Sequence, residues 1–340
     1  MTLEITKNIV VSSRIRLARN LASLPFQGHL TDVTKARNAA KSIYQVLESR
    51  GFQLLRLKNA EQSRKQYFLE ARKISKDLID NSDISALIFS ADEKISIMVH
   101  EEDHLRIQCV QDGFSLSDAY AKLDEVDEVL IKNLEIAYDN AFGFLTACPT
   151  NVGTGMRASI MLFLPALTMD GNIANLIQAI QKLGLTVRGS VGEGSKAEGY
   201  LYQISNQITL GLTEAEIIAS VNSAVLKICE SEAAARKKLL NENYAELKDK
   251  SMRALGILSS CFSLSLKEFS ELYAKLKFGM SLGFIDFRNM AVLDELEISI
   301  MPAHLSQIAG KNLIDAQCDE FRAEYVGKIL REAVVKYLDI

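Results

Sequence analysis

The chain has 340 residues, of which 48% are hydrophobic and 24% charged, and its formal net charge is -4. This composition is typical of a globular protein with a real core, and the length suffices for one large and one smaller domain. A slightly acidic chain argues against whole-chain binding to nucleic acid or to a membrane surface.

No apolar run approaches the roughly 20 residues of a membrane-spanning helix. The first eleven residues hold one lysine and no long apolar stretch, so they do not resemble a signal peptide. The five cysteines include no Cys-x-x-Cys pair, and the four histidines lack metal-ligand spacing. We therefore expect no disulfide framework and no zinc site, in a reducing compartment such as the cytoplasm.

Residues 12–20 read Ser-Ser-Arg-Ile-Arg-Leu-Ala-Arg-Asn. Successive side chains of a strand leave opposite faces, so Arg14 and Arg16 are expected on one face and Ile15 and Leu17 on the other. An exposed strand edge is the ordinary alternative. Arg19 breaks the alternation, which suggests a structural role.

Three strands are predicted next, at residues 85–89, 95–99 and 105–110. The first two flank a polar turn. In the third, Arg106 and Gln108 share one face, and apolar residues share the other. The pattern predicts a meander.

The acidic segment 101–104 (Glu-Glu-Asp-His) follows an apolar strand. Three neighbouring acids repel one another and favour a nearby cation, which could be a substrate, Mg²⁺ or Arg106. A polar hairpin turn explains the segment equally well.

Residues 117–137 have a helical apolar stripe, whereas the short apolar run 158–167 fits a buried strand or a helix. Between them, Cys148 opens a loop shaped by Pro149, Gly153 and Gly155, whose backbone N–H groups could bind an anion. Nearby arginines would favour the thiolate form of Cys148. A buried structural cysteine is the alternative, but the polar neighbours favour a function.

A second glycine-rich loop covers residues 189–196. Its Ser195-Lys196 order does not fit a P-loop, which requires Lys-Ser or Lys-Thr. Glu193 stands between two glycines, so its carboxylate is expected on exposed backbone.

Thr213 and Glu216 form a capping box that opens a long helix. Its charge-rich part, residues 230–250, is expected to link two domains. Beyond residue 252 the pattern predicts three or four amphipathic helices.

Five arginines lie within these polar motifs. Guanidinium groups are planar, permanently charged forks that match phosphate oxygens. Their convergence near isolated carboxylates indicates an enzyme that handles a polyphosphate, and we expect a kinase. The five are Arg14, Arg16, Arg106, Arg157 and Arg188.

Four of the motifs, at residues 12–20, 101–106, 148–154 and 188–193, together resemble the ATP:guanido phosphotransferases in this order. The resemblance covers roughly residues 8–215. Creatine and arginine kinases have a helical domain before the first motif, whereas here a helical region follows the catalytic part. This arrangement is similar to the bacterial protein arginine kinases (McsB-like).

The resemblance implies an α+β fold. Residues 1–250 would form a guanido-kinase catalytic domain with a mainly antiparallel sheet flanked by helices. Residues 251–340 would form a C-terminal α-helical domain for phosphoarginine binding, substrate binding or dimerisation.

The resemblance also implies roles for single residues, with ATP and Mg²⁺ as cofactors. Glu102 and Glu193 would hold the substrate guanidinium, with Glu102 as the base, and Cys148 would orient it as a thiolate. The implied nucleotide-binding residues are Ser12, Ser13, Arg14, Ile15, Arg16, Arg106, Arg157, Ala158, Ser159, Ile160, Met161, Arg188, Gly189, Ser190, Val191, Gly192 and Glu193. This agrees with the chemistry, because a guanidinium must lose a proton before it attacks, and phosphoryl transfer needs positioning and cations.

Two departures from the family pattern stand out. His100 replaces the usual Asn, which suggests an altered pH dependence. Residues 318–323 match a phosphoarginine-binding motif, Arg-Asp-x-x-Arg-Ala, and retain Asp319 and Arg322. The first Arg of that motif is Cys318, and a thiol cannot make a bidentate contact with phosphate. A simple surface helix explains this stretch equally well.

The predicted function is phosphorylation of arginine side chains in proteins, which marks them for stress-response regulation or degradation in the bacterial cytoplasm. One alternative is a phosphagen kinase that acts on free arginine or another small guanidino compound. The other is a phosphoarginine-binding adaptor with weak turnover. The resemblance implies a homodimer and, as partners, a zinc-binding activator protein, a heat-shock repressor and a Clp-type chaperone. We expect no nucleic-acid or membrane partner.

Overall fold

The computed structural model describes residues 2–189, 198–287 and 290–337. The chain divides into two compact units. The first comprises Met1–Leu162, Ala174–Arg188 and Gln203–Cys229, and the second Phe163–Ile173, Gly189–Tyr202 and Glu230–Ile340. The helix α8 (Glu214–Ser260) contributes to both units. The expected boundary at residue 250 lies within this helix and stays a prediction.

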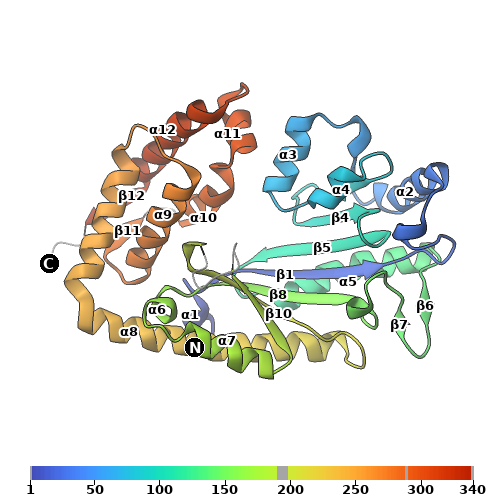
Figure 1. The fold of residues 1–340 in the computed structure, drawn as a ribbon, viewed down its shortest axis with the longest axis horizontal. Helices are drawn as coiled ribbons and strands as arrows, with labels where there is room; N and C mark the ends of the chain where they lie inside the picture. The colour runs from blue at the N-terminus through green and yellow to red at the C-terminus, as the bar shows by residue number, and fades with distance from the viewer. Residues whose placement is uncertain (1, 190–197, 288–289, 338–340) are drawn as a thin grey trace. The chain divides into compact units, whose positions relative to one another are not determined.

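Among the described residues, the largest sheet has eight strands in the order β2-β3-β4-β5-β1-β8-β10-β9. Of these strands, Figure 1 labels β4, β5, β1, β8 and β10. The pairings from β2 to β8 are all antiparallel, which confirms the predicted sheet. The strands are β1 (Val10–Arg19), β2 (Gln53–Arg56), β3 (Ala86–Phe89), β4 (Ile95–Val99), β5 (Leu105–Asp112), β8 (Met156–Phe163), β9 (Leu185–Gly189) and β10 (Leu201–Asn206).

One face of this sheet is apolar. Ile15 and Leu17 of β1 are buried there, as the alternation predicts. Helix α5 (Leu116–Asn133) packs against β1 and β5, and helix α2 (Val33–Glu48) packs beside α5. Burial of this face stabilises the sheet at about 25 cal/mol per Å² of apolar surface removed from water.

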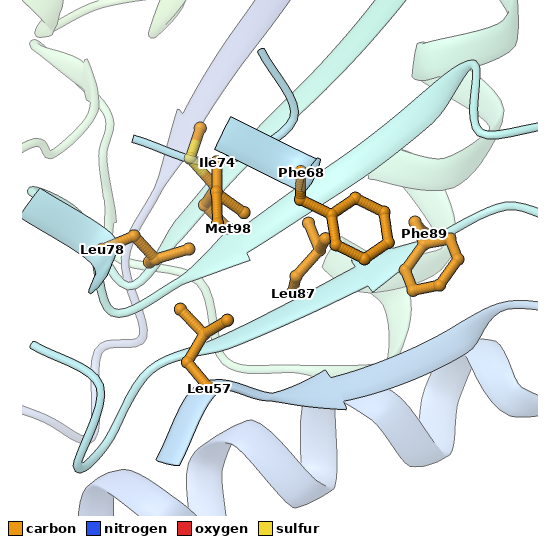
Figure 2. Close-up of a cluster of buried hydrophobic side chains, with 7 residues drawn as sticks. All are labelled: Leu57, Phe68, Ile74, Leu78, Leu87, Phe89 and Met98. Atoms are coloured by element: carbon orange, nitrogen blue, oxygen red, sulfur yellow. The ribbon is translucent and has the colours of Figure 1, made fainter. Parts of the chain in front are cut away.

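The opposite face carries Arg14, Arg16 and Arg106. At β3 and β4 the same face carries a cluster of buried apolar side chains (Figure 2). Register pairs Leu87 with Met98 and Met98 with Arg106, so all three side chains leave the same face. Helices α3 (Gln62–Glu70) and α4 (Lys76–Asp80) cover this end of the face. The cluster consists of Leu57, Phe68, Ile74, Leu78, Leu87, Phe89 and Met98.

The run 158–167, which the sequence left open between strand and helix, contains both. It holds most of β8, followed by helix α6 (Pro165–Met169), where Pro165 fits the first helical turn. At the start of α8, the Glu216 carboxylate accepts from the Thr213 backbone N–H at 2.8 Å, and the Thr213 hydroxyl accepts from the Glu216 N–H at 3.3 Å. This reciprocal pair is the expected capping box.

The C-terminal region contains α9 (Leu266–Ser281), α10 (Met290–Ser299), α11 (Pro302–Ala309) and α12 (Asp315–Ala333), as the helical pattern predicts. A two-stranded sheet of β11 (Ile285–Phe287) and β12 (Val334–Tyr337) was not expected. These strands are too short for periodicity to reveal, and they pair across a long stretch of sequence.

The other elements are short. They include α1 (Thr2–Thr6), α7 (Ile173–Lys182) and the hairpin of β6 (Tyr138–Asp139) and β7 (Gly143–Phe144). Among the helices that the structure describes, none is both long and apolar enough to cross a membrane.

Candidate active site

Five arginines form what we call the arginine cluster: Arg14, Arg16, Arg106, Arg157 and Arg188. Arg14 and Arg16 lie on β1, Arg106 on β5 and Arg157 on β8, which are adjacent strands. Register places Arg16 directly opposite Arg157 and Arg106 opposite Ala18. Arg188 near the end of β9 is close enough to repel both Arg16 and Arg157. The sheet therefore brings together residues far apart in sequence.

The cluster has a strongly positive potential. Burial, together with repulsion from the other arginines, lowers the pKa of Arg14 to about 10 and that of Arg16 to about 8. Burial and repulsion by Arg188 and Arg106 also lower the pKa of Arg157. Guanidinium groups stay protonated at neutral pH, so the lowered pKa values reflect the cost of burying several like charges side by side.

Two buried nitrogens of the cluster have no acceptor among the described residues: Nε of Arg16 and Nε of Arg157. Buried polar groups are almost always hydrogen-bonded in native proteins. Phosphate oxygens match guanidinium donors in both charge and geometry, so the residues present fit the phosphates of a nucleotide.

The acidic segment after β4 divides its roles among three carboxylates. Glu101 is buried and accepts a hydrogen bond from Arg106 at 2.5 Å. Burial acts to raise the pKa of Glu101, but the charge and hydrogen bond of Arg106 outweigh it and the pKa is lowered. Asp103 is buried and bonds to Asn20 and to the backbone of Ala147. The acidic segment is therefore not a simple polar turn, because two of its carboxylates are buried and hydrogen-bonded.

Glu102 is the exposed member of the segment. Partial burial of its carboxyl group, followed by the charges of Asp103 and Glu101, raises its pKa, while a hydrogen bond with Cys148 acts to lower it. A carboxylate with a raised pKa is a better proton acceptor at neutral pH. The structure thus brings the proposed base and the proposed orienting thiol into contact.

The Cys148 side chain is half-buried, and its Sγ lies 3.0 Å from the Thr150 hydroxyl. It is therefore not the buried structural cysteine of the alternative. The prediction that backbone N–H groups of this loop bind an anion is wrong for residues 151–154, because these groups already donate to carbonyl oxygens of the chain. Gly153 is required there, since a Cβ atom would lie 2.4 Å from the Thr209 carbonyl oxygen.

The other predicted nucleotide residues divide between the two faces. Ser12, Ser159 and Met161 share the face of Arg14 by register. Three residues lie fully buried on the apolar face: Ile15, Ala158 and Ile160. Ser13 is also buried and donates to the Gly113 carbonyl at 2.7 Å. Gly189 ends β9, whereas Ser190, Val191, Gly192 and Glu193 lie outside the described residues.

Sequence reasoning missed Arg72, which follows α3 and is close enough to repel Arg14. Its backbone carbonyl accepts from Gln108 Nε2 at 3.0 Å, and this bond ties the residue to β5. Arg72 has a positive φ of 57°, an unusual backbone conformation outside glycine. Only the fold brings it near the cluster, so no local sequence signal marks it.

His100 has a structural position. Its φ is 61°, in the left-handed region where both Asn and His are enriched, so His suits this position as well as the Asn that the family resemblance implies. Its Nε2 lies 2.9 Å from the Ala36 carbonyl oxygen. Burial lowers the pKa of His100 to about 4, so the ring does not titrate near neutral pH. The pH effect expected of this residue is not supported.

Asp319 and Arg322 of the second unit form an ion pair, as their spacing on α12 allows. The Arg322 guanidinium is buried and donates to the carbonyl oxygens of Ile300 at 2.9 Å and Leu264 at 2.6 Å. Cys318 beside them is also buried. Arg322 thus joins three segments of its unit through the backbone.

A cavity of about 210 Å³ lies elsewhere, between α2, β2 and the segment before β3. Its lining includes Arg37, Arg56 and Lys58 but no member of the arginine cluster.

Comparisons with known proteins identify the family of this chain. The family model described as ATP:guanido phosphotransferase, C-terminal catalytic domain, matches residues 34–235. A protein-arginine kinase of Clostridium kluyveri is 41% identical over 323 residues, which cover 94% of this chain and 93% of the relative. One of Caldanaerobacter subterraneus subsp. tengcongensis is 39% identical, with 97% and 99% covered.

Solved structures show the same fold. Lombricine kinase is 25% identical, with a TM-score of 0.59 over 66% of each chain. The substrate-free duplicated taurocyamine kinase of Schistosoma mansoni is 23% identical, with a TM-score of 0.61 over 79% of this chain and 40% of that one.

Fold and site together define a phosphotransferase that uses ATP and acts on guanidino groups. The chain belongs to the ATP:guanido phosphotransferase family. Within the family, residues 244–336 match the model described as Protein-arginine kinase McsB C-terminal domain.

Proposed function

We propose that this protein is a protein-arginine kinase, which transfers the γ-phosphoryl group of ATP to arginine side chains of other proteins. The observation that carries the proposal is the match of residues 244–336 to the C-terminal domain of protein-arginine kinases, directly after the catalytic match. The curated relatives with this name match nearly the whole chain.

The donor side of the reaction uses the arginine cluster. Its guanidinium groups bind the phosphates and stabilise the negative charge on the migrating phosphoryl group. The unpartnered Nε atoms of Arg16 and Arg157 are the best placed, because they lose no existing hydrogen bond when a phosphate oxygen arrives.

The acceptor side uses Glu102, Cys148 and, by family resemblance, Glu193. Glu102 accepts a proton from the substrate guanidinium, and the freed nitrogen lone pair forms the N–P bond while the bond from the γ-phosphorus to its bridging oxygen breaks. Cys148, in contact with Glu102, orients the guanidinium without a covalent intermediate.

Mg²⁺, when bound, would neutralise phosphate charge during transfer. Within the described residues no group of three or more His, Cys, Asp or Glu side chains could hold a metal ion. This fits Mg²⁺ carried largely by the ATP phosphates and water, as is common at kinase sites.

We further propose a cytoplasmic homodimer that marks proteins for stress-response regulation or degradation. A zinc-binding activator, a heat-shock repressor and a Clp-type chaperone would be its partners. Family resemblance alone supports these points. A phosphagen kinase for small guanidino compounds has less support, because the lombricine kinase structure covers only 66% of this chain, whereas the protein-arginine kinases cover 94% and 97%. A phosphoarginine-binding adaptor also has less support.

The proposal is tested by incubating the protein with MgATP and an unfolded protein substrate, with free arginine in a parallel tube. Phosphosites are then assigned by mass spectrometry at neutral pH. Phosphoarginine on protein, with little on the free amino acid, is the expected result. Preferential phosphorylation of free arginine would identify a phosphagen kinase instead.

A further inference from the structure

Asn20, directly after β1, connects three segments of the site. It is buried, and its Nδ2 donates to the Asp103 carboxylate at 2.5 Å and to the Leu145 carbonyl at 3.1 Å. Its Oδ1 accepts from the His104 backbone N–H at 2.9 Å. One side chain thus joins the arginine-bearing strand, the acidic segment and the Cys148 loop.

Asp103 makes the closing contact of this network. Its Oδ1 also accepts from the Ala147 backbone N–H at 2.7 Å. Asp103 directly follows Glu102, and Ala147 directly precedes Cys148. The hydrogen bond between them therefore fixes the separation of the two side chains assigned to the substrate guanidinium.

Burial of the Asp103 carboxylate costs free energy. Asp103 is only 2% exposed, and the ion pairs of the described residues do not include it. A buried carboxylate without a cationic partner is destabilising relative to an apolar residue. Its cost is reasonable where it positions a site, because functional positions often carry such destabilising features.

We propose that Asp103 and Asn20 are positioning residues, which hold Glu102 and Cys148 at the spacing that the acceptor guanidinium requires. Their role toward the acceptor guanidinium rests on the proposed function, whereas the hydrogen-bond network of Asn20 and Asp103 rests on geometry alone. Both side chains are buried, so they act through Glu102 and Cys148 rather than on the substrate itself.

The test compares Asp103→Ala, Asp103→Asn and Asn20→Ala in a Cys261→Ser background. The other cysteines besides Cys148 are buried, so iodoacetamide then reports on the Cys148 thiol. Asp139→Ala is the matched control, since its carboxylate also accepts backbone N–H groups, at 2.8 and 3.0 Å, but in the β6–β7 hairpin.

We expect Asp103→Ala and Asn20→Ala to speed alkylation of Cys148, because the loop loses its anchor. Acceptor kcat/KM should fall on the order of 100-fold, the usual effect of a misplacement near 1 Å, with ATP affinity unchanged. Asp103→Asn keeps the accepting oxygen and should retain alkylation and kcat/KM close to those of the parent. The Asp139→Ala control should match the parent.

Unchanged alkylation and acceptor kcat/KM in folded Asp103→Ala and Asn20→Ala would overturn the proposal. A folded Asp103→Asn as defective as Asp103→Ala would also overturn it, because charge rather than the contact would then matter. Should Asp103→Ala fail to fold by circular dichroism, Asn20→Ala alone decides. Alkylation needs no turnover, so the hydrogen-bond network of Asn20 and Asp103 is tested even if the parent protein phosphorylates nothing.

Discussion

At the scale of residues, arginines in this protein differ by what faces their guanidinium group. Arg19 is buried against Asp127 at 2.7 Å and also donates to the Thr154 carbonyl at 2.9 Å, so its charge is compensated within the fold. Arg16, three residues earlier on the same strand, retains a buried Nε with no partner among the residues that the structure describes. The first arrangement is structural, and the second fits a ligand anion.

Replacing Arg157 by Ala should weaken ATP binding about 10- to 100-fold, because a charged hydrogen bond contributes about 1.5–3 kcal/mol. Isothermal titration calorimetry measures the Kd directly. Arg253→Ala is the control, since Arg253 is exposed and pairs only with Asp249 among the described ion pairs. An unchanged Kd for Arg157→Ala would remove this residue from the phosphate site.

The pH dependence should follow Glu102. Its raised pKa means that the base becomes protonated, and acceptor kcat/KM falls, at a pH above the ordinary Glu value of about 4.3. Asp103→Asn removes a neighbouring negative charge, so the acid limb should move to lower pH. Rate profiles measured from pH 4 to 8 would contradict the assignment if this limb did not move.

At the scale of elements, the ion pair of Arg19 and Asp127 ties the end of β1 to α5. Asp127→Ala should reduce stability by about 3–5 kcal/mol, because it leaves a buried arginine without its partner. Urea unfolding measures the change. Glu128→Ala on the same helix should leave stability nearly unchanged, since its pair with Lys132 is exposed. Equal effects would contradict this account.

Many of the secondary-structure elements and their faces can be predicted from the sequence. Alternation in residues 12–20 gave the two faces of β1, and Thr213 with Glu216 gave the start of α8. Arg72 escaped prediction because only tertiary folding brings it near Arg14. The backbone of the Cys148 loop was misjudged, because the carbonyls that occupy its N–H groups include Thr209, far along the chain.

At the scale of the whole molecule, the two units place their buried arginines differently. Within the described residues, two buried donors of the arginine cluster in the first unit have no partner, whereas Arg322 of the second donates to backbone carbonyls and pairs with Asp319. The phosphoarginine pocket suggested by Asp319 and Arg322 stays a prediction, and these contacts give Arg322 a structural role whether or not a ligand binds.

Arg322→Met should therefore lower the Tm of the protein by several degrees, because each lost bond from a charged donor contributes about 1.5–3 kcal/mol. Differential scanning calorimetry measures this change without any ligand. Arg253→Met is the exposed control. A Tm equal to that of the parent would show that Arg322 is not a structural bridge.

We propose that Glu102 and the arginine cluster form one site for phosphoryl transfer to protein arginine. The most direct measurement compares phosphoarginine formation on an unfolded protein by the wild-type protein and by Glu102→Gln, with ATP affinity determined in parallel. We predict that Glu102→Gln loses transfer while its Kd for ATP stays near that of wild type. Retained transfer, or loss of ATP binding together with transfer, would contradict the assignment of Glu102 as the acceptor-side base.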